Sequence, residues 1–314
     1  MTAVSASVQA TPGGTRPAVL VTGASRGIGE ACVRRLVRDG WRVFAGVRTD
    51  AAAARLQSEL GDAVLPVILD VTDPALIRAA ASTIEADTGH DGLTALVNNA
   101  GIAVAGPLEF LPIDEFRRQL EVNVTGQIAV TQACLPLLRQ ARMSAPGGQR
   151  DRAGRIIFMS SVSGRSALPL LGPYAASKFA LEAAADALRV ELRPFGIRVV
   201  LVEPGVILTP IWDTSLASAR RAGERMPAEA YTWYGRSLDG LAGMVESGMR
   251  GLPPESVAGV VARALAAPRP RARYVVGRDA RARILMQTLL PVGVRDRIVA
   301  FAMKRLQRQG RHDP

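Results

Sequence analysis

From residue 18 onward, short apolar runs alternate with longer segments in which apolar residues recur at helical spacing. Residues 18–22 (AVLVT) form an uninterrupted apolar run before a glycine, which is typical of a strand buried on both faces of a parallel sheet. Apolar positions three or four residues apart in 27–39 predict the helix that follows. The same alternation predicts strands at 41–46, 64–69, 93–97, 155–159, 197–202 and 273–276, and helices at 51–60, 74–87, 114–121, 122–142, 173–195 and 254–266.

This order of strands and helices is the pattern of βαβ units, which makes the strands parallel and puts helices on both faces of the sheet. We therefore expect an α/β protein with a single Rossmann-like, doubly wound domain over residues 17–278 and a seven-stranded parallel sheet. Residues 1–16 are rich in small and polar residues, and we expect them to form a flexible tail.

Three segments fall outside the alternation. Residues 143–153 are polar and contain glycine, so we expect a surface loop there. Residues 207–251 form a long stretch, for which we expect a substrate-binding lid, because long loops in compact domains are usually functional. Residues 279–314 form a basic extension, which Pro291 and Gly293 divide into two short amphipathic helices.

Composition narrows the function classes. The 314 residues carry 39 Lys and Arg against 28 Asp and Glu, a net charge of +11, and their 48% hydrophobic content argues against disorder. The two cysteines are expected to be buried reduced thiols, and with only two histidines we expect neither a metal site nor a Ser-His-Asp hydrolase. The arginines are scattered outside any nucleic-acid motif, so we expect no nucleic-acid partner. Without a signal sequence or a membrane-spanning run, the default is a cytoplasmic protein.

Residues 22–29 (TGASRGIG) follow the first predicted strand and open the first predicted helix. Gly23, Gly27 and Gly29 let the chain turn tightly and let the backbone approach a ligand closely. The free N–H groups and the dipole of a helix N-terminus favour anions at such a turn. This context predicts a site for the pyrophosphate of a dinucleotide.

Further motifs follow in order along the chain: NNAG at 98–101, Asn123, Ser161, YAASK at 174–178, and Pro204-Gly205 with Thr209. Together with the glycine turn, this series resembles the motifs of the short-chain dehydrogenase/reductase family over residues 18–278. Within that family, residues 174–212 are most similar to the hydroxysteroid and retinol dehydrogenase branch.

Tyr174 and Lys178 lie four residues apart, so a helix places them on one face. A tyrosine hydroxyl has an ordinary pKa of about 10, which is too high for an efficient base at neutral pH. A nearby ammonium favours the phenolate. The spacing therefore predicts that Lys178 lowers the pKa of Tyr174 and makes it a usable acid/base.

The resemblance implies the remaining roles. Ser161 would hydrogen-bond the substrate oxygen, Tyr174 would pass it a proton, and Lys178 would also hold the nicotinamide ribose. Asn123 would fix a water that links Lys178 to solvent. The predicted cofactor-binding residues are Gly23, Ser25, Arg26, Gly27, Ile28, Gly29, Arg48, Asp70, Val71, Asn98, Ala100, Gly101, Tyr174, Lys178, Pro204, Gly205, Val206 and Thr209.

The end of the second strand bears on the choice of cofactor. It reads Val47-Arg48, without the acidic residue that holds the ribose hydroxyls of NAD. Arg48 and Arg26 instead offer two cations for a 2′-phosphate, which favours NADP(H). Asp50 lies two residues further on and keeps NAD(H) open.

Apolar residues between Ser161 and Tyr174, and again after Pro204, predict a pocket for a hydrophobic alcohol or ketone, such as a steroid, a retinoid or another lipid. Mutual packing of these residues is the alternative. The predicted substrate-binding residues are Ser161, Ser163, Leu168, Tyr174, Ile211 and Trp212.

Two questions stay open at this stage. The same fold can serve as a non-catalytic NADP-binding sensor or scaffold, although such proteins typically lose the tyrosine or the lysine. The basic C-terminal helices either lie on an anionic membrane surface or cover the substrate opening or a subunit contact. The resemblance implies a homodimer or homotetramer.

Overall fold

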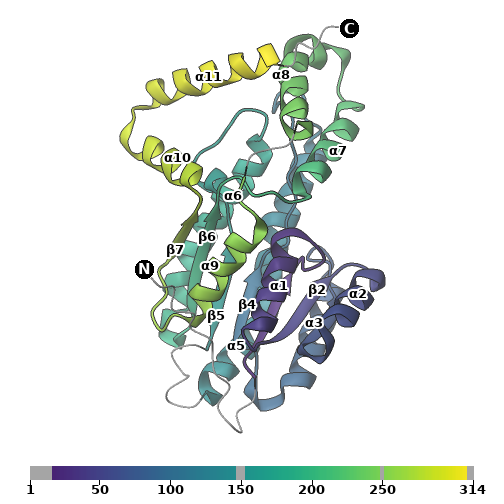
Figure 1. Ribbon diagram of the computed structural model, residues 1–314, viewed down its shortest axis with the longest axis vertical. Helices are drawn as coiled ribbons and strands as arrows, with labels where there is room; N and C mark the ends of the chain where they lie inside the picture. Colours follow the sequence, from purple (N-terminus) through teal and green to yellow (C-terminus); the bar gives the residue numbers. More distant parts are fainter. Residues whose placement is uncertain (1–15, 146–152, 248–250, 310–314) are drawn as a thin grey trace.

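The computed structural model describes residues 16–145, 153–247 and 251–309. The predicted N-terminal tail, apart from Arg16, and most of the predicted loop at 143–153 lie outside the described residues. Seven parallel strands form one sheet in the order β3-β2-β1-β4-β5-β6-β7 (Figure 1). They are β1 (Ala18–Thr22), β2 (Arg42–Val47), β3 (Val64–Ile68), β4 (Ala95–Asn98), β5 (Arg155–Met159), β6 (Arg198–Pro204) and β7 (Arg273–Val276). This confirms the predicted α/β fold with its seven-stranded parallel sheet.

Helices cover both faces of the sheet. One face packs against α1 (Gly27–Arg38), α2 (Asp50–Leu60) and α9 (Pro254–Ala266), and the other against α3 (Pro74–Thr88), α5 (Gly126–Ser144) and α6 (Gly172–Glu191). Side chains of one strand alternate between the two faces: Val19 and Val21 join the first core and Leu20 the second. Because both faces are buried, the strands are apolar throughout, which is why they read as uninterrupted runs.

The strand order predicts that a ligand binds between β1 and β4. β1 pairs with β2 on one side and with β4 on the other, so the chain leaves β1 toward opposite edges of the sheet. In open parallel sheets, ligands bind at the carboxyl ends of the strands at such a reversal. The predicted motifs lie at the ends of β1, β4, β5 and β6 or in the segments that follow these strands.

Among its described residues, the segment 207–251 contains two helices, α7 (Ile211–Gly223) and α8 (Ala228–Glu246). Its role as a substrate-binding lid stays a prediction. Its Ala, Leu, Arg and Met residues are good helix formers, and this propensity supports the two helices. Ala222, Met226 and Ala230 pack with Val104 and Leu111 in a small apolar cluster of their own, apart from the two cores of the sheet.

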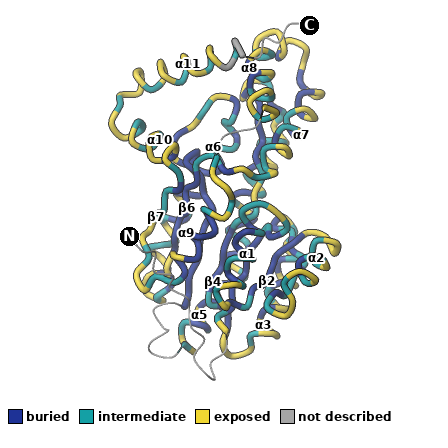
Figure 2. The backbone as a smooth tube through the Cα atoms, viewed as in Figure 1, coloured by how far each residue is buried: buried dark blue, intermediate teal, exposed yellow. Residues whose placement is uncertain are grey.

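The C-terminal extension forms the two predicted helices, α10 (Arg278–Leu289) and α11 (Val292–Gln309), with Pro291 between them. At the far end of α11, the Gln307 amide donates to the Ser237 hydroxyl of α8 over 2.7 Å. We call α7, α8, α10 and α11 the helical arch, because Figure 1 shows them spanning the carboxyl edge of the sheet. Much of the arch is exposed, whereas the sheet below is buried (Figure 2).

Candidate active site

The turn between β1 and α1 is shaped by contacts that exclude side chains. Gly23 has a φ of +64°, where glycine is favoured, and a Cβ on Gly29 would lie 2.2 Å from the carbonyl oxygen of Gly23. The Asn99 amide holds the same backbone by donating to the Thr22 carbonyl over 2.9 Å. No side chain caps the N-terminus of α1 at Arg26. Its first N–H groups are therefore available to an anion, as the glycine spacing predicts.

The segment after β4 is tied to this turn. The Thr22 hydroxyl accepts from the backbone N–H groups of Asn99 and Ala100, over 2.9 and 3.0 Å. Asn98, predicted to bind the cofactor, has a fully buried side chain whose amide donates to Thr131 of α5 over 2.8 Å. The side chain of Asn98 is therefore bonded to α5, whereas that of Asn99 is bonded to the backbone of the glycine turn.

The loop after β6 faces the glycine turn from the opposite side. A Cβ on Gly27 would lie 3.4 Å from the side chain of Thr209. Asp70, after β3, accepts from the backbone N–H and the hydroxyl of Thr72, over 3.0 and 2.7 Å. The predicted cofactor residues thus come from the carboxyl ends of β1, β2, β3, β4 and β6, and from α6.

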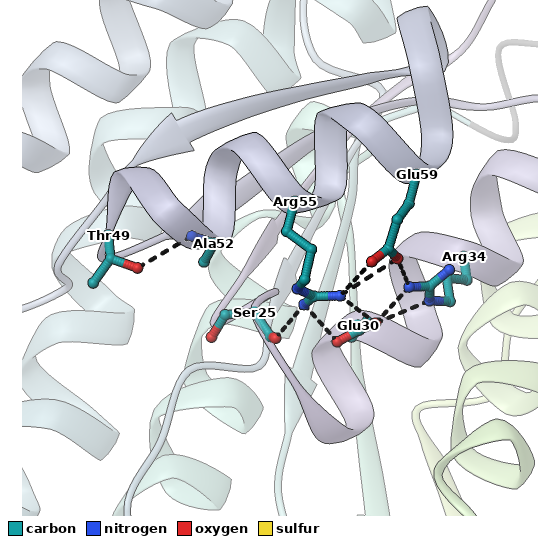
Figure 3. A network of polar contacts seen from close by, with 7 residues as sticks. All are labelled: Ser25, Glu30, Arg34, Thr49, Ala52, Arg55 and Glu59. Carbon is teal, nitrogen blue, oxygen red and sulfur yellow. Dashed lines mark hydrogen bonds and ion pairs between the residues drawn. The ribbon is translucent and has the colours of Figure 1, made fainter.

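A charged network braces α1 against α2 beside the turn (Figure 3). Arg55 donates to the Ser25 carbonyl over 2.8 Å and to the Glu30 carboxylate over 2.9 Å, and Arg34 also pairs with Glu30. These arginines hold the pKa of Glu30 below its ordinary value. Arg26 and Arg48 lie outside this network and are exposed.

Ser161, Tyr174 and Lys178 come together at the carboxyl end of β5. Ser161 is 7% exposed, hydrogen-bonds Tyr174, and has its hydroxyl held by the N–H of Ser163 over 3.1 Å. Lys178 is buried, donates to the Met159 carbonyl over 2.7 Å, and has its Nζ 5.7 Å from the centroid of the Tyr174 ring. The i, i+4 spacing on α6 therefore puts both side chains on the face that meets β5.

The electrostatics of this group differ from the sequence expectation. Burial raises the pKa of Tyr174 above its ordinary value, and the opposing influences are the hydrogen bond from Ser161 and the charge of Arg283. Burial also lowers the pKa of Lys178 to about 8, against the charge of Glu182. The predicted lowering of the Tyr174 pKa by Lys178 is absent, because desolvation of the phenolate dominates.

Asn123 is fully buried in a π-helical turn, η3 (Glu121–Thr125), between α4 (Ile113–Leu120) and α5. Its Oδ1 accepts from the Ile102 N–H over 2.9 Å, and its Nδ2 donates to the Ser177 hydroxyl over 3.1 Å. Ser177 in turn donates to the Tyr174 carbonyl over 2.7 Å. Asn123 thus connects the segment after β4 to the helix that carries the tyrosine. Its link to a water stays a prediction.

The predicted substrate residues lie on two sides of the site. Ser163 and Leu168 follow β5, while Ile211 and Trp212 begin α7, where the Trp212 indole donates to the Ile207 carbonyl over 3.1 Å. A cavity of about 420 Å³ lies further out, between α7 and α8. Its lining includes Ala105, Leu216, Met226, Tyr231 and Leu238, and none of the predicted catalytic residues.

Residues of α10 reach this site, and the sequence motifs missed them. Asp279 accepts from the Val206 N–H over 2.9 Å. Arg283 donates to the Ser166 carbonyl over 2.7 Å, and Gln287 donates to the Ser166 hydroxyl over 3.0 Å. Their spacing in the sequence could have pointed to them, because positions 279, 283 and 287 share one face of a helix.

Both cysteines are buried, as expected from the sequence. Cys32 and Cys134 are buried free thiols, and burial raises the pKa of each to about 12. Within the described residues, no cluster of three metal-ligating side chains occurs, and no helix combines the length and apolar character needed to cross a bilayer.

The chain is similar to known proteins of one family. A family model of the short chain dehydrogenases matches residues 17–219. The chain is 34% identical over 290 residues to NADPH-dependent 3-dehydrocapnine reductase of Ornithobacterium rhinotracheale, covering 92% of this chain and 98% of the relative. It is 36% identical over 294 residues to retinol dehydrogenase 5 of Mus musculus, covering 91% and 89%. The solved short chain dehydrogenase of Burkholderia cenocepacia in complex with NADP matches with a TM-score of 0.68 at 25% identity, covering 90% and 97%.

The chain therefore belongs to the short-chain dehydrogenase/reductase family, a family of nicotinamide-dependent oxidoreductases. Within it, the chain is similar to the retinol dehydrogenases, as residues 174–212 predict.

Proposed function

We propose that this protein transfers a hydride between NADP(H) and a hydrophobic secondary alcohol or ketone of steroid-, retinoid- or lipid-like character, with Tyr174 as the acid/base. The observation that carries the proposal is the meeting of Ser161, Tyr174 and Lys178 at the carboxyl end of β5. The relatives named as a reductase and as a retinol dehydrogenase support the same class of reaction.

The residues present fit a dinucleotide. The uncapped N–H groups at the start of α1 would hold the pyrophosphate, and Thr209 faces them across Gly27. The exposed Arg26 and Arg48 would pair with a 2′-phosphate, and the Burkholderia neighbour shows that NADP binds to a protein of this fold. When bound, the nicotinamide supplies or accepts the hydride.

The chain's own residues handle the proton. In the direction of reduction, the raised pKa keeps Tyr174 protonated at neutral pH, so its hydroxyl can donate to the substrate oxygen as negative charge develops there. Ser161 would orient the same oxygen through its hydroxyl, which the N–H of Ser163 holds in place. The buried Lys178 ammonium would stabilise the phenolate that remains. In the direction of oxidation, the same phenolate would take the alcohol proton.

A substrate panel with a Tyr174→Phe variant tests the proposal. Hydrophobic ketones and alcohols are offered with NADPH, NADH and their oxidised forms, and the absorbance of the reduced nicotinamide is followed. We expect turnover with NADPH, and a loss of about 10²–10⁴-fold in kcat for Tyr174→Phe, since only the hydroxyl is removed. Tyr274→Phe is the matched control, because that hydroxyl accepts from the Arg271 N–H in front of β7. NADPH binding without turnover of any panel member would favour the sensor alternative.

A further inference from the structure

Two arginines of the helical arch, Arg283 and Arg295, have a buried Nε without a hydrogen-bond partner, and Arg283 is the one that contacts the segment after β5. Arg283 lies on α10, and one Nη donates to the Ser166 carbonyl over 2.7 Å. Its Nε is buried without a hydrogen-bond partner, and no ion pair to Arg283 is formed within the described part of the chain. A buried donor without an acceptor is rare in folded proteins and calls for an explanation.

The contacts on either side of Arg283 place it at the mouth of the active site. One turn earlier on the same face, Asp279 holds the N–H of Val206, in the loop after β6. One turn later, Gln287 donates to the hydroxyl of Ser166, five residues beyond Ser161. α10 is thereby fixed to both loops that flank Tyr174.

The charge of Arg283 acts on the reacting group. It opposes the burial that raises the pKa of Tyr174, and burial of the guanidinium itself lowers the pKa of Arg283. Asp279 is the carboxylate on the same helix, but its Oδ2 is engaged by the N–H of Val206. Arg283 is therefore a partly desolvated cation beside the catalytic tyrosine, and Asp279 acts on it through its charge alone, without an ion pair.

The glycine turn makes the cofactor an unsuitable partner for this cation. The phosphates are expected at the N-terminus of α1, at the carboxyl end of β1, whereas Ser166 belongs to the segment after β5. A group that reaches Arg283 would come from the substrate side of Tyr174.

We propose that Arg283 binds an oxyanion, such as a carboxylate or a sulfonate, carried by the substrate close to its reacting alcohol or ketone carbon. This deepens the proposed function and rests on it, since it narrows the hydrophobic substrate to an acidic amphiphile. The planar guanidinium suits a bidentate oxyanion, and its buried Nε would gain the acceptor that it lacks. The aliphatic part of the substrate would then extend toward the apolar residues of α7.

Matched acidic and neutral ketones test this assignment. The probes are 4-oxododecanoate and its methyl ester, reduced with NADPH by the wild-type protein and by Arg283→Met, Arg283→Lys and Arg281→Met. We expect the wild type to favour the acid in kcat/KM, and Arg283→Met to lower the acid-to-ester ratio about tenfold to a hundredfold. Arg283→Lys should recover part of the ratio. Arg281 is exposed two positions away on the same helix, so Arg281→Met removes the same charge and should leave the ratio unchanged.

A second measurement does not need turnover. Decanoate and decanamide are titrated into the wild-type protein by calorimetry, and we expect decanoate to bind at least about tenfold more tightly. Equal binding of the two, or an acid-to-ester ratio that is the same in Arg283→Met as in the wild type, would overturn the assignment. If the wild type reduces neither ketone, the proposed hydride transfer fails on these substrates, and the titration alone decides the role of Arg283.

Discussion

The glycine-turn side of the site and the helical arch are built by different physical means. On the turn side, backbones approach so closely that a Cβ on Gly29 would meet the Gly23 carbonyl at 2.2 Å. In the arch, Gly293 has nothing within 4 Å of a Cβ, and Leu289 and Phe301 are 68% and 71% exposed. The cofactor side is thus fixed by contacts that tolerate almost no change. The substrate side is made of helices that join the rest of the molecule through a small apolar cluster, ion pairs such as Arg225–Asp114 and single hydrogen bonds.

The largest expected effect in this comparison comes from adding one methyl group on each side. Gly29→Ala drives a Cβ into backbone that cannot yield, so we expect about 3 kcal/mol of strain and close to a hundredfold loss of NADPH affinity. Gly293→Ala is the matched control in the arch and should raise the free energy of unfolding by about 0.5–1 kcal/mol. Fluorescence titration with NADPH and thermal unfolding measure both. Equal effects of the two substitutions would remove the contrast between the regions.

The same contrast explains which features were predictable from the sequence. The strands and the glycine turn could be predicted from the sequence. A strand that is buried on both faces must be apolar, and the crowded positions Gly23 and Gly29 exclude a side chain. The proximity of Ser161, Tyr174 and Lys178 could be predicted as well, because Ser161 lies at the end of one strand and the other two lie one turn apart on one helix.

Two features of the arch escaped prediction for physical reasons: the helices α7 and α8, and the contact of α10 with the site. α7 and α8 lack a motif, and their small cluster with Val104 depends on segments about a hundred residues away. Arg283 has the sequence context of a solvated arginine, and only the tertiary contact with Ser166 shows otherwise. The direction of the Tyr174 pKa shift was also wrong, because the i, i+4 spacing reveals the nearby ammonium but says nothing of burial.

The cofactor side can be probed through its exposed cations. Arg48→Ala removes a predicted partner of the 2′-phosphate, so we expect the preference for NADPH over NADH in kcat/KM to fall about tenfold to a hundredfold. Arg38→Ala serves as the control, since Arg38 is exposed at the other end of α1. An unchanged preference in Arg48→Ala would remove this argument for NADP(H) and make NAD(H), with Asp50 as its ribose partner, an equal candidate for the cofactor.

A pH profile tests the buried catalytic helix, which separates the two regions. The pKa of Lys178 is lowered to about 8, so its charge is present below that pH and is lost above it, while the raised pKa of Tyr174 keeps the tyrosine protonated throughout. We expect kcat/KM for ketone reduction to be level near neutral pH and to fall above pH 8, by about tenfold at pH 9. Lys178→Arg keeps its charge over this range and should abolish the fall. A fall that persists in Lys178→Arg would assign it to another group.

The smallest effect is expected where the two regions touch. A Cβ on Gly205 would lie 2.1 Å from Oδ2 of Asp279, the same oxygen that accepts from the N–H of Val206. Gly205→Ala should therefore displace the Asp279 carboxylate, and Asp279→Ala should lose the hydrogen bond to the loop. Since both substitutions break one contact, the double variant should be less destabilised than the sum of the two, by about 0.5–2 kcal/mol in the free energy of unfolding. Denaturant unfolding of the four proteins measures this coupling. Strict additivity would mean that the contact between Asp279 and the loop after β6 contributes nothing to the free energy of unfolding. The arch would then not be anchored to the cofactor side through α10.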